Sequence, residues 1–207
     1  VRDRNAKGTP LDILASWNLN PEVRHRSSSG GVFSALAAII LEQNGVVVGA
    51  ASDEQLAVRH IIIEDLKDLH RIRGSKYVQS KVSKSIYGGI RSHLRKGRRV
   101  LFAGTPCQVA GVRKYIGTND SNLLACDLIC HGVPSPRVLR AYIKHRGGKK
   151  KRPASIDFRN KNTGWKNSSI RLGFSDDTAE YSKLADDPYF QAFIRDLGLR
   201  EACYRCA

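Results

Sequence analysis

The sequence feature that most constrains the fold is a predicted strand-to-helix corner in the middle of the chain. The apolar run 100–103 predicts a buried strand, and it is followed by Gly104, Thr105, Pro106 and Cys107. Pro106 suits the first turn of a helix, where its missing N–H costs nothing. Cys107 would then lie near free backbone N–H groups at the positive end of the helix, which favour a thiolate. The corner thus offers a ligand or nucleophile position, although a lone cysteine beside a turn is more often a small buried side chain.

A second predicted strand, residues 123–130, brings another cysteine toward the same place. We expect this strand to end at Cys130, just as the first ends before Cys107. Binding sites in α/β sheets form at the carboxyl ends of neighbouring strands, so these two cysteines are expected to meet. Cys126 lies about 13 Å farther down the strand, at roughly 3.3 Å per residue, and is interpreted as a core residue. His131 is interpreted as a loop histidine with a local hydrogen bond rather than a ligand.

The last two of the five cysteines form the pair Cys203-x-x-Cys206. With Cys107 and Cys130 they would supply four thiolates, which suit zinc or an iron–sulfur cluster. Zinc usually takes its ligands from two local knuckles, whereas two of these cysteines are single and far apart, so the spacing favours a cluster. A thioredoxin-like dithiol is a third interpretation, disfavoured because no strand–helix pattern precedes the pair. The odd count also favours metal or redox chemistry over structural disulfides.

Two glycine-containing turns are candidate anion sites. In the first, residues 26–31 (RSSSGG), serine hydroxyls and Arg26 precede a buried helix predicted over 32–41 and capped by a serine. Hydroxyls, glycine backbone and a helix N-terminus together suit a phosphate, although helix capping alone explains the pattern equally well. The second turn, residues 73–77 (RGSKY), adds an ammonium and a phenol but lacks the spacing of a P-loop.

The overall pattern predicts an α/β fold: a mixed, largely parallel sheet flanked by helices, with a small antiparallel meander in the C-terminal third. Residues 1–26 are interpreted as a linker or edge segment, 27–146 as the α/β core, and 147–207 as the meander, a helix and the terminal cysteine pair. The sheet strands are expected at 45–51, 57–63, 100–103 and 123–130, the meander strands at 155–159, 169–174 and 179–183, and further helices at 64–71, 82–96, 108–116, 136–146 and 188–197.

The chain is strongly basic, with 35 Lys and Arg against 19 Asp and Glu, a formal net charge of +16. This favours anionic partners such as phosphate-bearing cofactors, an acidic electron carrier or nucleic acid. Only 7% of residues are aromatic, so no base-stacking platform is visible and nucleic acid is disfavoured. No apolar run reaches the roughly 18 residues of a membrane span, and the N-terminus is charged, which indicates a cytoplasmic protein. The absence of Met suggests an excised fragment.

These segments, in this order, resemble the coenzyme F420 hydrogenase/dehydrogenase beta-subunit family. The matching stretches are SSGGVF at 28–33, GSKY at 74–77, GTPCQ at 104–108, CHGVPSP at 130–136, FRNK at 158–161 with GW at 164–165, and Cys203-x-x-Cys206. The form with CHGVPSP and GW is similar to the bacterial branch, in which this region follows a ferredoxin-like domain with two 4Fe-4S clusters. That domain and the family's C-terminal end are missing from this sequence.

The resemblance implies an iron–sulfur flavoprotein module that binds FAD and one 4Fe-4S cluster and passes electrons between clusters and a hydride carrier. The implied cluster ligands are Cys107, Cys130, Cys203 and Cys206. The implied flavin-binding residues are Arg26, Ser28, Ser29, Gly30, Gly31, Gly74, Ser75, Lys76, Tyr77 and Thr105. Arg26 and Lys76 would be electrostatic partners of phosphate or reduced flavin. The scheme requires no general acid or base, so no catalytic residue is assigned.

The implied partners are a ferredoxin-like domain or a ferredoxin, together with a hydride carrier of the deazaflavin or nicotinamide type. Two other functions remain open at this stage. One is a basic, zinc-stabilised module that binds nucleic acid or another polyanion, supported by the charge and the four cysteines. The other is a structural subunit that holds a cluster without catalysing hydride transfer. The buried α/β pattern suits a cofactor pocket better than a polyanion surface.

Overall fold

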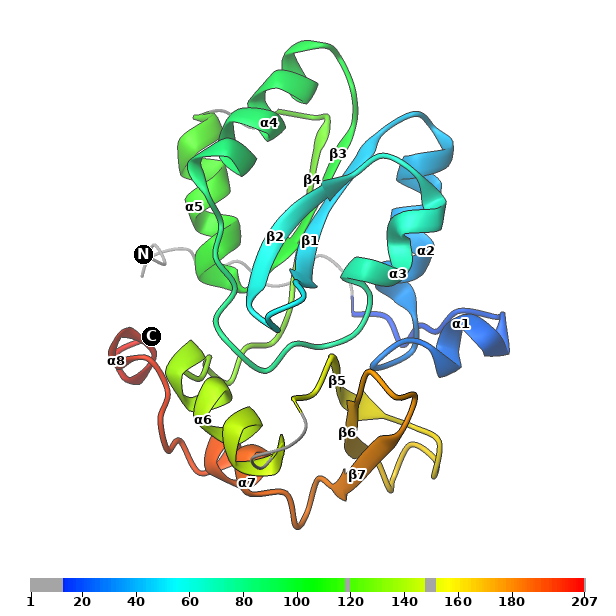
Figure 1. The fold of residues 1–207 in the computed structure, drawn as a ribbon. Helices are drawn as coiled ribbons and strands as arrows, with labels where there is room; N and C mark the ends of the chain where they lie inside the picture. The colour runs from blue at the N-terminus through cyan, green and yellow to red at the C-terminus, as the bar shows by residue number, and fades with distance from the viewer. Residues whose placement is uncertain (1–12, 118–119, 148–151, 207) are drawn as a thin grey trace.

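A four-stranded sheet organises the first two thirds of the chain. A computed structural model describes residues 13–117, 120–147 and 152–206. The strands are arranged in the order β2–β1–β3–β4, with β1, β3 and β4 parallel and β2 antiparallel to β1 (Figure 1). Their bounds are Val46–Ser52 for β1, Val58–Ile63 for β2, Val100–Gly104 for β3 and Leu123–Asp127 for β4. The predicted mixed, largely parallel sheet is confirmed.

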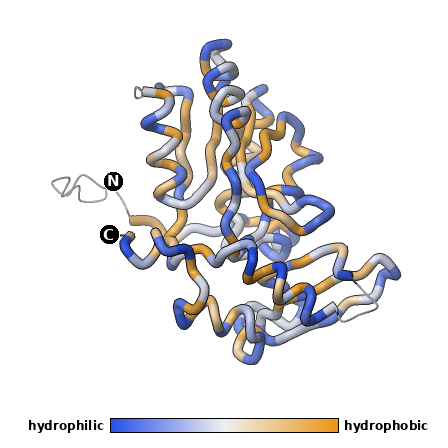
Figure 2. The backbone as a smooth tube through the Cα atoms, turned by 60° about the vertical axis from the view of Figure 1, so that its left-hand side comes forward, coloured by the Kyte–Doolittle hydropathy of each residue, from blue (hydrophilic) through white to orange (hydrophobic). Residues whose placement is uncertain are grey.

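Helices cover both faces of this sheet, which explains why its central strands are almost wholly apolar. On one face α2 (Val32–Glu42) and α3 (Leu69–Ile72) pack on a cluster that includes Val47 and Leu101. On the other face α4 (Lys84–Arg95) and α5 (Pro106–Ile116) pack on a cluster that includes Val46, Val48 and Phe102. Alternate residues of each strand thus face opposite layers. Figure 2 shows the apolar strands running through the interior between more polar segments.

The predicted antiparallel meander is also confirmed. Strands β5 (Ser155–Asn160), β6 (Ser169–Gly173) and β7 (Ala179–Lys183) pair in chain order. Helices α6 (Pro136–Gly147) and α7 (Pro188–Ile194) lie beside this small sheet, below the larger one (Figure 1). A shared core cluster joins these elements; its members include Phe158, Ile170, Leu172, Tyr142 and Tyr189.

The shorter elements differ from expectation in detail. Helix α1 (Pro21–His25) lies within the segment interpreted as a linker. Residues 1–12 of that segment lie outside the described ranges, and so do residues 148–151 of the basic run 144–152. The helix predicted over 64–71 divides into a 3-10 turn, η1 (Leu66–Asp68), and α3. The helix predicted over 188–197 ends at Ile194, and α8 (Glu201–Tyr204) follows it. Within the described ranges, no helix is long and apolar enough to cross a bilayer.

The N-cap expected for α2 was wrong in its residue type. Gly31, not a serine, precedes the first turn, and its φ of +85° lies in the left-handed region that glycine adopts easily. The serines are engaged elsewhere: Ser27 Oγ donates to Val23 O at 2.7 Å, and Ser28 Oγ accepts from the N–H of Ser75 at 2.6 Å. The Ser-Gly turn is therefore shaped by tertiary contacts rather than by helix capping.

The position of Cys130 also needs correction. Strand β4 ends at Asp127, three residues earlier than predicted, because its partner β3 ends at Gly104, the residue paired with Asp127. Leu128 and Ile129 are exposed and follow no strand alternation. Cys130 therefore lies on a loop beyond the carboxyl end of the sheet, instead of at the last position of a strand.

Candidate cofactor site

The corner between β3 and α5 forms as the sequence predicts. Pro106 opens the helix and Cys107 occupies its first turn, exposed at the carboxyl edge of the sheet. Thr105 N–H donates to Gln108 Oε1 at 3.0 Å, and Gln108 Nε2 donates to the carbonyl of Ser80 at 3.2 Å. Thr105 Oγ1 lies 3.1 Å from Cys107 Sγ. The corner is thus tied both to its own helix and to the chain before α4.

A buried histidine that sequence reasoning missed supports this corner from beneath. His60 on β2 is only 3% exposed and stacks on Phe102 with ring centroids 5.2 Å apart. Its Nε2 donates to the carbonyl of Ala103 at 3.0 Å, which leaves Nδ1 to accept from Ser80 Oγ at 2.8 Å. Burial lowers the pKa of His60, and the nearby charge of Lys76 adds to that effect. His60 is therefore a neutral support for the last residues of β3, and no sequence motif marks it.

The end of the chain docks on the Cys130 loop through backbone pairing. Arg200 N–H donates to Val133 O at 3.0 Å, and Ser135 N–H donates to Gly198 O at 3.1 Å. Gly132, the residue before Val133, has φ +144°, and a Cβ there would lie 2.7 Å from Leu199 Cδ1. This backbone conformation favours glycine. The pairing places α8, which carries Cys203, beside the Cys130 loop.

The pKa of the Cys130 thiol depends on burial and on three other cysteines. Burial is the main cause that raises the pKa of the Cys130 thiol, opposed by a hydrogen bond from the Gly132 N–H. The negative charges of Cys107, Cys203 and Cys206 raise it further, so all three lie within electrostatic range. All four thiols are free of disulfides. In the described part of the chain, no three His, Cys, Asp or Glu side chains meet closely enough to hold a metal ion as they stand.

Cys126 stands apart from this group, as the sequence predicts. It packs against the core cluster of β3 and α2, which includes Leu101 and Ala37. Burial raises the pKa of its thiol, and the adjacent charge of Asp127 adds to the shift. None of the other four cysteines contributes to that shift. Cys126 is thus a core residue of β4.

The two turns that the sequence marked separately form one structure. The hydrogen bond from Ser75 N to Ser28 Oγ joins them, and a cavity of about 180 Å³ lies against both. Three predicted residues line this cavity: Arg26, Ser28 and Gly74. The rest of its wall comes from His25 and Ser27 and from the small sheet and its following turn, namely Asp157, Arg159, Asn160, Lys161 and Asn162.

Like charges gather around this turn cavity. Burial lowers the pKa of Arg73, and the neighbouring Arg26 lowers it further. The pKa of Lys161 is likewise lowered by burial and then by the charge of Arg159. Lys161 Nζ also donates to Arg24 O at 2.6 Å, which ties the small sheet to α1. Asp157 also lines the cavity and opposes the shift of the Lys161 pKa, but the cations in the lining outnumber it, and an excess of positive charge favours an anion.

Two family models match the chain, and both describe the beta subunit of coenzyme F420 hydrogenase/dehydrogenase. The model of its N-terminal part matches residues 13–87, and the model of its C terminus matches residues 97–207. The chain belongs to this family. The turn cavity's Ser28 and Gly74 fall within the N-terminal match, and Cys107, Cys130 and the terminal pair fall within the C-terminal match.

A solved structure of the F420-reducing [NiFe] hydrogenase complex from Methanosarcina barkeri, derivatised with xenon, has a similar fold. The TM-score is 0.61 at 15% sequence identity, over 92% of this chain. The chain spans 63% of the length of that subunit. The comparison with curated proteins found no match.

Several predicted flavin residues of this beta-subunit family member do not line the turn cavity. Ser29 is exposed, and Gly30 packs against the backbone of Trp17. The ring of Tyr77 lies in an aromatic cluster, stacked on Phe193 with centroids 5.0 Å apart. The remaining ones are Gly31 at the start of α2, Ser75 in the turn itself, Lys76 beneath it, and Thr105 beside Cys107.

Lys76 is half-buried beneath the second turn rather than extended into the cavity. Its Nζ donates to the carbonyls of Arg73 at 2.8 Å and Gly74 at 3.2 Å. Burial lowers the pKa of Lys76 to about 8, with the charge of Asp157 acting in the opposite direction. Lys76 therefore shapes the turn and adds a positive charge below it.

The depressed pKa of Lys76 predicts a pH-dependent stability. Because the folded value of about 8 lies below the reference value of 10.5, the unfolded chain binds more protons between these limits. The free energy of unfolding should thus rise with pH across this window, by about 3 kcal/mol, and should fall as the pH is lowered through it. Urea unfolding at several pH values gives the free energy of unfolding of wild type and of Lys76→Met as a function of pH. The rise should be present in the wild-type curve and absent from the Lys76→Met curve.

The matched control is Lys84→Met, which changes an exposed lysine at the start of α4. Its stability should follow the wild-type pH profile. If the Lys76→Met protein also followed that profile, the side chain would titrate normally and the burial argument would be wrong.

Proposed function

We propose that this chain is an electron-transfer module that binds one 4Fe-4S cluster and FAD and passes electrons between the cluster and a hydride carrier. The observation that carries the proposal is the arrangement around Cys130. The backbone pairing of residues 198–200 with 133–135 brings the segment of Cys203 and Cys206 to the Cys130 loop. Charge on Cys107, Cys203 and Cys206 contributes to the raised pKa of the Cys130 thiol, and Cys126 does not contribute. Four thiolates are the ligand set that a 4Fe-4S cluster takes.

The cluster ligands would be Cys107, Cys130, Cys203 and Cys206, all free thiols in this fold. When bound, the cluster supplies one-electron chemistry. The protein's part is to hold the ligands: Cys107 through the β3–α5 corner, and the terminal pair through the pairing of residues 198–200 with 133–135. The exposed positions of Cys107, Cys130 and Cys206 leave them open to the inserted group.

The flavin would bind with its phosphates at the turn cavity. Ser28 and Gly74 contribute polar atoms and backbone, while Arg26, Arg159 and Lys161 supply positive charge. The flavin, when bound, converts between two-electron and one-electron transfer. The ammonium group of Lys76, beneath the turn, adds a further positive charge near that anion. These residues bind and orient the cofactor, and none is required to move a proton.

The two parts of the site are mechanically joined. Gln79 N–H donates to Pro134 O at 3.0 Å, linking the chain after Tyr77 to the Cys130 loop. Between them, the ring of Phe193 stacks on Tyr77 and meets His131 edge-on with centroids 5.1 Å apart. A fixed relation between flavin turn and cysteine loop is what transfer between two cofactors requires.

The partners follow from the same proposal. The solved structure described above is an F420-reducing hydrogenase complex, which supports a deazaflavin as the hydride carrier and other subunits as partners. The net charge of +16 supports an acidic electron carrier such as a ferredoxin or ferredoxin-like domain.

The test is the composition of protein purified without oxygen. We expect broad cluster absorption, flavin bands after addition of FAD, and about four irons with matching acid-labile sulfide per chain. Iron, zinc, sulfide and flavin are measured on the same sample. Colourless protein with stoichiometric zinc would overturn the proposal and favour a zinc-stabilised module for a polyanion.

A further inference from the structure

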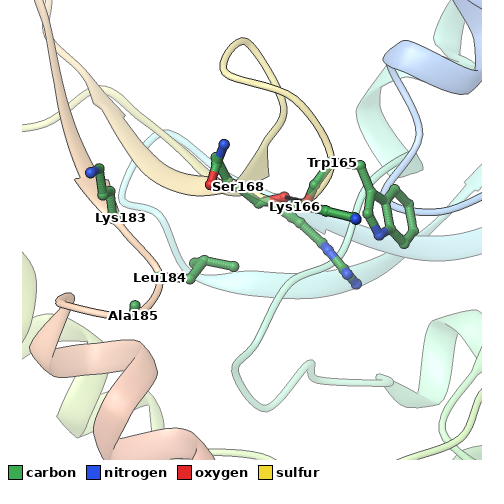
Figure 3. Close-up of a pocket in the computed structure, with 8 residues that line it drawn as sticks. Trp165, Lys166, Ser168, Lys183, Leu184 and Ala185 are labelled. Atoms are coloured by element: carbon green, nitrogen blue, oxygen red, sulfur yellow. Dashed lines mark hydrogen bonds between the residues drawn. The ribbon is translucent and has the colours of Figure 1, made fainter.

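A second cavity lies on the small sheet and shares one lining residue, Arg159, with the turn cavity. Its volume is about 340 Å³, and the residues that line it include Arg159, Trp165, Lys166, Ser168 and Lys183. Figure 3 shows Lys183, Leu184 and Ala185 on one side of this pocket and Trp165 and Lys166 on the other, with Ser168 between them. We call it the Trp165 cavity.

Positive charge dominates the wall of the Trp165 cavity. Three of its lining residues, Arg159, Lys166 and Lys183, are cationic, and no described Asp or Glu is among the lining residues. Within the described ranges, the side chains of these three cations form no ion pair or hydrogen bond. Three uncompensated cations around one cavity attract an anion and favour one with more than a single negative charge.

Arg159 carries an unused donor. Its Nε is buried and has no hydrogen-bond partner among the described residues. The guanidinium carbon lies 4.7 Å from the centroid of the Trp165 ring, a cation–π contact that orients the group. A buried donor without a partner is costly, and an anion that accepts from it removes that cost. Arg159 lines the Trp165 cavity, so an anion bound there could serve as the acceptor for this Nε.

Trp165 adds an apolar wall beside these charges. Its indole is 49% exposed, and Lys161 lies 5.4 Å from the ring centroid. A half-exposed aromatic ring next to a set of cations suits a ligand that carries both a planar ring and an anionic group.

We propose that the Trp165 cavity is a second anion site that binds the phosphate group of an organic phosphate whose planar ring packs against Trp165. The site is distinct from the turn cavity proposed for the flavin phosphates, although Arg159 lines both. It does not depend on the flavin or on the cluster. The phosphate would interact with Arg159, Lys166 and Lys183, and Ser168 completes the polar part of the wall.

Tryptophan fluorescence tests this proposal in the full chain. Only two tryptophans are present, so Trp17→Phe leaves Trp165 as the single reporter. We expect a saturable change with inorganic phosphate at constant ionic strength. Adenosine 5′-monophosphate should bind roughly threefold to tenfold more tightly than inorganic phosphate, because its ring adds an aromatic contact. Adenosine without phosphate should give no response, and calorimetric titration provides an independent measure of each.

The charge of the cavity is tested by the double variant Lys166→Gln, Lys183→Gln. Both lysines are exposed, so the fold is retained, and the affinity for inorganic phosphate should fall roughly tenfold. The matched control is Lys84→Gln, Lys96→Gln, which removes the same charge from exposed ends of α4 and should leave the affinity unchanged.

Three results would overturn the proposal. The first is the absence of saturable phosphate binding by both fluorescence and calorimetry. The second is equal weakening by the two double variants, which would mean general attraction to a basic surface. The third is loss of the phosphate response when FAD is added in excess, which would assign both cavities to one ligand.

Discussion

The Cys130→Ala protein is expected to purify without iron, whereas the Cys126→Ala protein retains about four irons per chain. The two cysteines are four residues apart, yet they lie in different environments. Burial, and then charge on Cys107, Cys203 and Cys206, raises the pKa of the Cys130 thiol, while Cys126 packs against the core beside Leu101. Removal of one thiolate from a four-thiolate site eliminates the ligand set, and removal of a core thiol does not.

Iron and acid-labile sulfide are measured on both proteins after anaerobic purification, together with the visible spectrum. Circular dichroism and thermal unfolding show whether each variant is folded. The Cys126→Ala protein is the matched control, because it loses the same side chain from the same stretch of chain. Iron retained in folded Cys130→Ala protein, or lost equally from both, would remove Cys130 from the ligand set.

The second large effect is expected at Asp187, where replacement by alanine should lower the free energy of unfolding by about 3 to 5 kcal/mol. Asp187 is fully buried at the start of α7. Its carboxylate accepts from the Tyr142 hydroxyl at 2.7 Å and from the N–H groups of Tyr189 and Phe190, each at 3.0 Å. Arg146 NH1 lies 3.5 Å away. Alanine would leave the Tyr142 hydroxyl and the two N–H groups without this acceptor in the interior, while Arg146 would keep its ion pair with Glu180.

Urea unfolding of wild type, Asp187→Ala and Tyr142→Phe measures the effect. Tyr142→Phe removes a single hydroxyl and should cost about 1 kcal/mol. Asp65→Ala is the control, since Asp65 also caps a short helical turn, η1, but is exposed to solvent. This substitution should lower the free energy of unfolding much less than Asp187→Ala does. If Asp187→Ala proved no more destabilising than Asp65→Ala, the buried network would contribute nothing that an exposed cap does not.

Local patterns predicted most of the secondary structure. The apolar runs of β1 and β3 are continuous because both faces of the sheet are covered, and the Gly104–Pro106 step marks a strand end and a helix start with definite backbone requirements. The period-2 runs of β5, β6 and β7 are equally local signals. These features need no knowledge of distant contacts.

The candidate site was harder to predict because distant segments build it. Sequence spacing could place Cys107 at a strand end, but it could not show that β4 stops at Asp127. The pairing of residues 198–200 with 133–135 joins parts of the chain more than 60 residues apart, and no local pattern reports it. The same holds for Arg159, which reaches the turn cavity from the small sheet.

The roles of two polar side chains, His60 and Lys76, were also not predicted from the sequence. His60 lies in β2 between Arg59 and three isoleucines, and only its contacts with Ala103 and Ser80 reveal its role. Lys76 was predicted in the correct turn, but its side chain turns back to the carbonyls of Arg73 and Gly74. Which way a long side chain turns depends on the room beneath it, and sequence does not encode that locally.

The four proposed ligands are held by elements of very different strength. Cys107 stands on an eleven-residue helix that follows the central strand, whereas Cys203 and the residues beside it form a helix of only four residues. A helix that short does not persist alone, so α8 depends on its docking to the Cys130 loop. Detachment of that segment would withdraw two thiolates together while the parallel sheet stays folded. Under the proposed function, docking of this terminal segment would bring Cys203 and Cys206 to the other two cysteines and complete the set of four thiolates.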